Sequence, residues 1–251
     1  MVKNKKGQVT IFIILGVLIV GGIVGLLFLT NGPSSEAPSK QGPSNFVRSC
    51  ARDIVKESVQ KILDSGGDMT PQKSVMYQGQ NYTFLCYQAD NYLPCYSLYP
   101  GLEKKIELEI REDTVDAVKQ CFEEFKQDSE DKGFLVNFRK MEYSIDLLPG
   151  GVKINLQREV TVSKEGSSQE FENFDAKILS SLYELVNLAR EVVNDESKFC
   201  AFEYVGYMLL YADYDIRRIN YNSNRIYKLI NRKTSEEFKF AVRGCTYPPG
   251  I

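Results

Sequence analysis

The 251-residue sequence predicts an α+β fold, with a single N-terminal transmembrane helix followed by a disulfide-bonded extracellular region of helices and antiparallel sheet. Three observations lead to this prediction. Residues 9–29 carry no charged side chain, and all six cysteines follow that stretch. The rest of the sequence has runs of helical period and runs of period two that are segregated along the chain, which favours α+β over a parallel βαβ fold.

The apolar stretch over residues 9–29 has the length of a membrane-spanning helix. At about 1.5 Å per residue it extends roughly 31 Å, which matches a hydrocarbon core of about 30 Å. Lys3, Lys5 and Lys6 precede it and no positive cluster follows it, so the positive-inside rule puts the N-terminus in the cytoplasm. We therefore expect a single-pass protein of the cell membrane. Residues 1–30 form its cytoplasmic flank and transmembrane helix, the lipid bilayer is its partner through residues 9–29, and the C-terminal region is extracellular.

Two further interpretations of this stretch stay open. Gly21 and Gly25 have the small-xxx-small spacing through which membrane helices self-associate, but glycine is common in such helices and chance explains the spacing equally well. A cleaved secretory signal is the other alternative, although its apolar region is normally only about 7–15 residues long.

The residues before the apolar stretch carry a more specific motif, Lys5-Lys6-Gly7-Gln8. It resembles the class III signal of archaeal type IV pilin-like proteins, which implies cleavage by a prepilin peptidase between Gly7 and Gln8. The string KKGQVTIFIILG is also similar to the start of uncharacterised surface proteins of small-genome archaea, and the closing EFKFAVRG resembles the same family. Pilins usually carry a glutamate at the fifth mature position, where this sequence has Phe12, so the resemblance implies an anchor more than a filament subunit.

Composition narrows the functional classes. The chain has 33 acidic and 31 basic residues and no basic patch, so we expect no nucleic-acid partner. Histidine is absent, which removes the usual neutral-pH base and the commonest metal ligand. The sequence contains no phosphate-binding loop, dinucleotide fingerprint or nucleophile elbow. We therefore predict no catalytic residues, no metal and no cofactor.

The region after the apolar stretch divides by composition and period. Residues 31–44 form a linker rich in proline, glycine and serine, and residues 45–131 form a helix-hairpin-helix subdomain. In that subdomain we predict a helix over 45–65, capped by Ser44 or Asn45 and closed by Gly66-Gly67. A hairpin over 75–88 turning at Gly79-Gln80 and a second helix over 102–126 follow.

Residues 132–251 form the second predicted subdomain, an antiparallel α+β unit. The turn over 149–151 separates strands at 134–138 and 141–147 from strands at 152–157 and 159–163. Apolar residues at helical spacing predict a helix over 174–193. Residues 200–211 are apolar nearly all round, which predicts a buried helix. Three closing strands are expected over 216–221, 225–230 and 237–242.

Six cysteines in an oxidising compartment predict three disulfides. Cys86 and Cys95 bracket a loop, while Cys50 and Cys121 fall on the inner faces of the first two predicted helices. That leaves Cys200 and Cys245 as the third pair. Free reactive thiols are the alternative, but no C-x-x-C spacing supports a redox or zinc role.

The best binding candidate is a tyrosine-rich loop that contains Tyr87, Tyr92, Tyr96 and Tyr99. Tyrosine combines a rigid apolar ring with a polar tip, which suits contacts with sugars or a partner protein. The alternative is that these rings pack over the neighbouring hairpin. Asn81 begins the sequon Asn-Tyr-Thr and is a candidate glycosylation site.

These expectations combine into a membrane-anchored extracellular structural or adhesion protein of the archaeal cell surface that is not an enzyme. Its partners would be other surface proteins or glycans. One alternative is a type IV pilin-like filament subunit processed after Gly7. The other is an extracytoplasmic enzyme that uses carboxylates. A cleft with two perturbed carboxylates would favour the enzyme, and an exposed apolar or aromatic patch would favour binding.

Overall fold

The computed structural model describes residues 42–90 and 93–244, and these form one compact unit. Several predictions therefore concern residues outside the described ranges: the span over 9–29, the processing site at Gly7 and Gln8, the glycines at 21 and 25, Tyr92 and Cys245. Within the described ranges, no helix combines the length and apolar character needed to cross a membrane.

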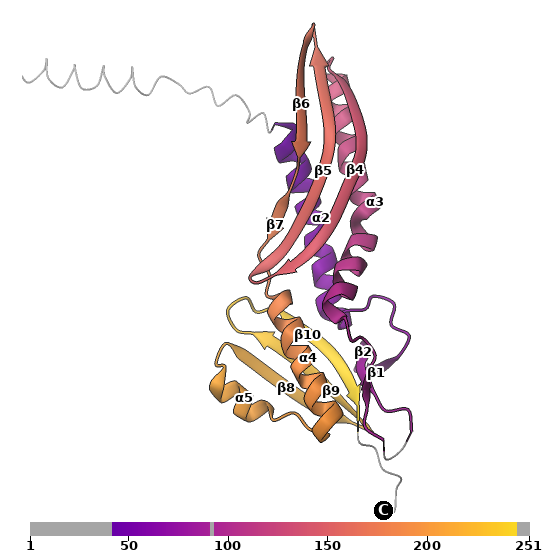
Figure 1. Cartoon of the computed structure of the whole chain (residues 1–251), viewed down its shortest axis with the longest axis vertical. Helices are drawn as coiled ribbons and strands as arrows, with labels where there is room; N and C mark the ends of the chain where they lie inside the picture. The colour runs from indigo at the N-terminus through magenta and orange to yellow at the C-terminus, as the bar shows by residue number, and fades with distance from the viewer. Residues whose placement is uncertain (1–41, 91–92, 245–251) are drawn as a thin grey trace, which may run out of the picture. The chain divides into compact units, whose positions relative to one another are not determined.

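A pair of long helices opens the unit (Figure 1). They are α2 (Pro43–Ser65) and α3 (Leu102–Asp131). Helix α2 begins two residues earlier than expected, with Gly42 as its N-cap. The predicted cap at Ser44 or Asn45 is wrong, because Pro43 has the fixed φ that suits a first helical position. The predicted C-terminal end of α2 is confirmed, because Gly66 adopts a left-handed conformation and its backbone N–H donates to the Ile62 carbonyl.

Two sheets follow. The first has the order β1-β2-β10-β9-β8, with β3 also paired to β2. Its strands are β1 (Ser74–Tyr77), β2 (Gln80–Tyr87), β3 (Tyr96–Ser97), β8 (Tyr214–Tyr221), β9 (Asn224–Asn231) and β10 (Glu237–Arg243). The β1–β2 hairpin is confirmed, but it turns at Gln78-Gly79, one residue early, where both residues have positive φ. Parallel pairing of β2 with β10 joins residues from both predicted subdomains into this one sheet.

The second sheet is built on the predicted turn at Pro149-Gly150. Strands β4 (Leu135–Leu148) and β5 (Gly151–Lys164) flank it, with Leu148 opposite Gly151. Each was expected as two short strands, but each is continuous, with a register shift after Phe138 and after Gln157. Strands β6 (Ser167–Asn173) and β7 (Ala176–Ile178) complete the sheet and were not predicted.

Helix α4 (Leu182–Phe199) starts eight residues after the predicted position at 174. The earlier start is wrong because residues 176–178 pair with β5 instead. The Asp175 carboxylate also accepts a hydrogen bond from the Leu156 backbone N–H at 2.8 Å, which holds this segment against the sheet. The helix ends at Cys200, which adopts a left-handed conformation.

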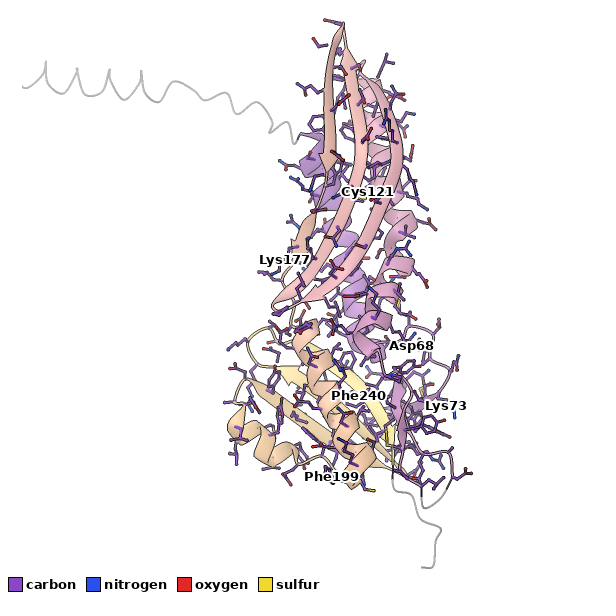
Figure 2. The ribbon with its side chains drawn as sticks, viewed as in Figure 1. Asp68, Lys73, Cys121, Lys177, Phe199 and Phe240 are labelled. Carbon is purple, nitrogen blue, oxygen red and sulfur yellow. A yellow bond between two sulfur atoms is a disulfide. The ribbon has the colours of Figure 1, made fainter. Side chains whose placement is uncertain are left out.

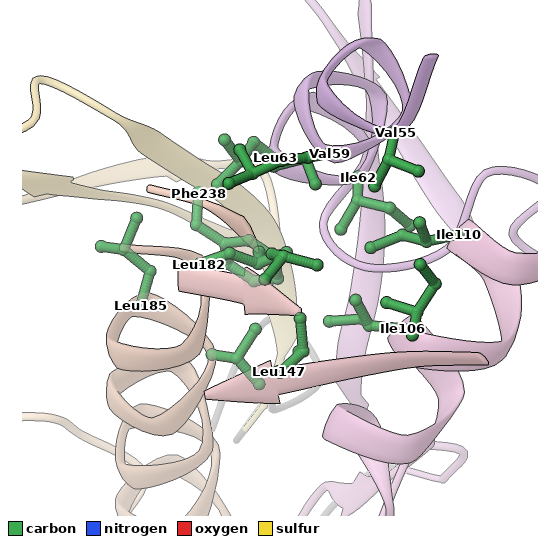
Figure 3. Packing of buried hydrophobic residues seen from close by; sticks show 14 of the residues in the cluster. Val55, Val59, Ile62, Leu63, Ile106, Ile110, Leu147, Leu182, Leu185 and Phe238 are labelled. Carbon is green, nitrogen blue, oxygen red and sulfur yellow. The ribbon is translucent and has the colours of Figure 1, made fainter. Parts of the chain in front are cut away.

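One hydrophobic core joins the helices to both sheets. Figure 3 shows side chains from α2, α3, β4, α4 and β10 converging on a common centre. Its buried members include Val55, Val59, Ile62, Leu63, Ile106, Ile110, Leu147, Leu182, Leu185 and Phe238. The 3–4 spacing read from the sequence of α2 and α3 therefore does mark the faces that are buried.

Two predicted disulfides are confirmed. Cys50–Cys121 links α2 to α3, with 6.1 Å between the Cα atoms, and Cys86–Cys95 closes the loop after β2. Cys200 is also disulfide-bonded, and its predicted partner Cys245 lies outside the described residues. None of the described cysteines is free.

Candidate functional site

One ring of the tyrosine loop, Tyr99, is engaged in a polar cluster. The Tyr99 hydroxyl donates to Asp68 Oδ2 at 2.6 Å, and Asp68 is itself buried. Burial, and then the neighbouring Asp68 carboxylate, raises the pKa of Tyr99. Asp68 also forms an ion pair with Lys105 at 3.3 Å. Tyr99 is thus held in a polar cluster at the base of α3 and is not available as a free contact ring.

Tyr87 and Tyr96 differ in exposure. Lys73 Nζ lies 3.8 Å from the centroid of the Tyr87 ring, and the Phe84 ring packs edge-on against it at 5.3 Å. Figure 2 shows Lys73 and Asp68 beside this hairpin. Tyr96 is 50% exposed. For Tyr87 and Tyr99 the arrangement fits the alternative in which the rings pack over the hairpin.

Asn81 lies exposed on β2, near the hairpin turn. Thr83, the third residue of the sequon, is buried, and its hydroxyl donates to the Ser65 carbonyl. The asparagine is therefore accessible while the threonine contributes to packing. Glycosylation of Asn81 stays a prediction.

An exposed apolar surface lies in the segment over 200–211, where the sequence did not predict one. The segment over 200–211 was expected to be a buried helix, and this is wrong. It forms only the short helix α5 (Tyr204–Leu210), none of whose residues is buried. Leu209 and Leu210 are each 81% exposed, Tyr211 is 52% exposed and Val205 51%. We call these four residues the α5 outer face.

The opposite side of α5 is firmly held against the sheet. Met208 Sδ accepts a hydrogen bond from the Ile216 backbone N–H at 3.1 Å. The Tyr207 ring lies 5.5 Å from Phe202 and 6.3 Å from Tyr214. Burial, and then Glu191, raises the pKa of Tyr207. The Glu203 carboxylate caps the helix by accepting from two backbone N–H groups.

This two-sided arrangement explains the wrong prediction. Residues 204, 207 and 208 follow the 3–4 spacing of a packed face, and Val205 and Leu209 form a second apolar stripe at i, i+4. A helix that is apolar all round is usually buried by its own chain. Here the part of the chain that the structure describes covers only one stripe. The brevity of the segment, between Cys200 and Asp213, was the available signal that it lies at an edge.

Two ion pairs lie just after α5. Asp213 pairs with Lys233, and Asp215 pairs with Arg217 at 2.9 Å. An apolar centre with a tyrosine and a mixed polar rim is typical of protein–protein interfaces. A helix that lies on anionic lipid instead carries a basic polar face, and these paired charges do not provide one.

A polar pocket lies in the first sheet, at the turn between β8 and β9. Its volume is about 360 Å³. Side chains of two arginines and three asparagines dominate the lining, which comprises Arg218, Asn220, Asn222, Ser223, Asn224, Arg225 and Gly244. No sequence motif marked these residues, because strand register brings them together.

Comparison of this chain with protein-family models, with curated proteins and with solved structures gives no match.

Proposed function

We propose that this chain is a non-catalytic binding protein held outside the cell by its N-terminal membrane segment, and that it attaches to a neighbouring surface protein through the α5 outer face. The observation that carries the proposal is the exposure of Leu209 and Leu210 on a helix whose other side is packed. Isolated exposed leucines are ordinary, but adjacent ones beside Val205 and Tyr211 make a contiguous apolar stripe.

The available binding energy is large enough for a specific contact. Complete burial of a leucine side chain is worth about 1.5–3 kcal/mol. Two leucines that are each 81% exposed thus offer roughly 2.5–5 kcal/mol before the costs of association. A few such anchors typically dominate an interface. Helix α5 is already ordered by its inner side, so little ordering entropy remains to be lost on binding.

Two observations support the extracellular, anchored placement over a filament. The Cys50–Cys121 and Cys86–Cys95 bonds fit an oxidising compartment. Helix α2 begins at Pro43 after a non-helical Gly42. A pilin spine would require the core helix to continue unbroken from the membrane segment, and Gly42 interrupts that continuity.

Site-specific photo-crosslinking in intact cells tests the proposal. The full chain carrying Leu209→benzoylphenylalanine should form a discrete heavier adduct on illumination. Leu210→Gln in the same chain should reduce that adduct at least tenfold, because the apolar stripe is broken. Leu135, which is 68% exposed at the start of β4, gives the matched control, and Leu135→benzoylphenylalanine should form no discrete adduct.

The products also discriminate between partners. An adduct of twice the chain's mass would identify a second copy as the neighbour. Crosslinking to lipid alone, or equal adducts from positions 209 and 135, would contradict a protein-binding role for the α5 outer face.

A further inference from the structure

The pocket at the β8–β9 turn is lined by residues other than those of the α5 outer face. Antiparallel pairing sets Arg218 opposite Tyr227 and Asn220 opposite Arg225. Residues 218 and 220 on β8, and 225 and 227 on β9, therefore share one face of the sheet, since directly opposed residues point the same way. Asn222 turns the chain in a left-handed conformation, with φ at 53°. Register thus gathers the polar side chains around one opening.

One arginine of the pocket is fully occupied by structural contacts. Glu196 of α4 is completely buried, and its carboxylate accepts from the Arg225 guanidinium and from the Tyr227 hydroxyl. Arg225 also donates to the Cys200 carbonyl at 2.7 Å, at the C-terminal end of α4. The charge of Arg225 is therefore neutralised by Glu196 and by the negative end of the helix dipole.

The second arginine has no such counter-charge. The Arg218 guanidinium lies 4.9 Å from the centroid of the Tyr204 ring, and no carboxylate among the described residues forms an ion pair with it. The nearby Asp215 is paired with Arg217, whose side chain alternates to the other face of β8. Among the described residues, two guanidinium groups meet one carboxylate, which leaves one net positive charge at the pocket.

The remaining lining favours a ligand with hydroxyl groups. Asparagine amides both donate and accept hydrogen bonds, and three of them surround the opening with the Ser223 hydroxyl. The amide oxygen of Asn224 is shielded from solvent and lacks a hydrogen-bond partner within the described residues, which is unfavourable.

We propose that this pocket binds the carboxylate-bearing sugar residue of an acidic glycan. Arg218 would hold the carboxylate in a charge-assisted pair, and the asparagine amides at positions 220 and 222 would hold the ring hydroxyls. A pocket of about 360 Å³ falls within the range of small-molecule sites. The proposal is independent of the protein contact through the α5 outer face.

Calorimetric titration of the full chain in detergent tests this. The probes are a trigalacturonate, the matching neutral galactose trisaccharide, and inorganic sulfate. The acidic trisaccharide should bind at least tenfold more tightly than either of the others, and its affinity should fall as salt is raised. Arg218→Gln should lower that affinity at least tenfold, and Arg218→Lys should lower it less, because the charge is kept without the planar fork.

Arg217→Gln is the matched control, since it removes a neighbouring arginine from the opposite face, and it should leave the titration unchanged. Asn222→Gly keeps the left-handed turn and should weaken binding about threefold, a typical loss for one hydrogen bond, so the test survives if Arg218→Gln fails to fold. Leu209→Gln should bind the acidic probe like the parent chain, which separates this site from the proposed protein contact.

Three outcomes would overturn the proposal. The first is that trigalacturonate does not bind up to about 10 mM, a range that covers weak millimolar affinities. The second is that the neutral trisaccharide binds as tightly as trigalacturonate, and the third is that sulfate does. An affinity for trigalacturonate that survives both Arg218→Gln and Asn222→Gly would place the binding elsewhere and also overturn it.

Discussion

Removal of the Cys50–Cys121 bond should destabilise the described unit more than removal of Cys86–Cys95. The two bonds span 71 and 9 residues. The loop-entropy model then assigns them about 4.4 and about 2.6 kcal/mol, because the longer closed loop restricts the unfolded chain more. The expected difference of about 1.8 kcal/mol corresponds to roughly twenty-fold in the folding equilibrium constant.

Urea unfolding of the chain from Gly42 onward, followed by far-UV circular dichroism, measures this difference. Two double variants are compared, Cys50→Ala with Cys121→Ala and Cys86→Ala with Cys95→Ala. Loss of side-chain packing alone would favour a larger destabilisation of the Cys86–Cys95 variant, opposite to the order predicted from the loops. Cys86 and Cys95 are both buried whereas Cys50 is half-buried, and cavities are costlier at buried sites. A larger loss for the first variant would therefore be attributable to the loop.

Equal losses, or a larger loss for the Cys86–Cys95 variant, would refute the entropic reasoning. The slope of the free energy of unfolding against urea serves as the internal control. An altered slope in either variant would point to a changed denatured state instead.

Three further predictions concern single side chains. Leu209→Gln should change the free energy of unfolding by less than about 0.5 kcal/mol, because the side chain is 81% exposed. Ile106→Ala, at a fully buried position, should instead lower the free energy of unfolding by about 2–5 kcal/mol. Denaturant titration of both variants measures this contrast. Glu196→Ala should cost about 3 kcal/mol by leaving the Arg225 guanidinium without its buried partner, and a loss below about 1 kcal/mol in thermal unfolding would show that Arg225 finds another partner or reaches water. Burial raises the pKa of Tyr143 to about 12. The neutral phenol is thus favoured in the folded state, and its contribution is complete below about pH 10 and is lost as pH rises toward 12. Tyr143→Phe should reduce the loss of stability over that window, and an unchanged alkaline unfolding profile would contradict this assignment.

The long helices were predictable because their signal is local and repeated. Helix α2 carries buried apolar residues at 3–4 spacing from Val47 to Leu63 and ends at a glycine that can adopt positive φ. The strands around Pro149-Gly150 were predictable for the same reason, since alternation and turn chemistry agree. Strand β6 carries no alternating apolar pattern, because six of its seven residues are exposed. Strand β7 has only three residues, and its place is fixed by pairing with β5.

The candidate sites depend on features that no local pattern records. A one-residue change in register would move Arg218 to the other face of β8 and abolish the pocket. Glu196 was indistinguishable in the sequence from the other acids of α4, yet it is completely buried. The apolar pattern of 200–211 was identified, but its meaning was misread, because apolar periodicity does not distinguish burial by the same chain from exposure to a partner.

Stability alone does not account for the leucines at positions 209 and 210. The inner side of α5 already fixes the helix through Tyr207 and Met208, so polar residues at the outer positions would keep those contacts and lower the risk of aggregation. Leucine there adds little to folding, since 81% of each side chain remains in water. Its free-energy gain becomes available only when another surface covers it, so the apolar character of this face is best explained by association.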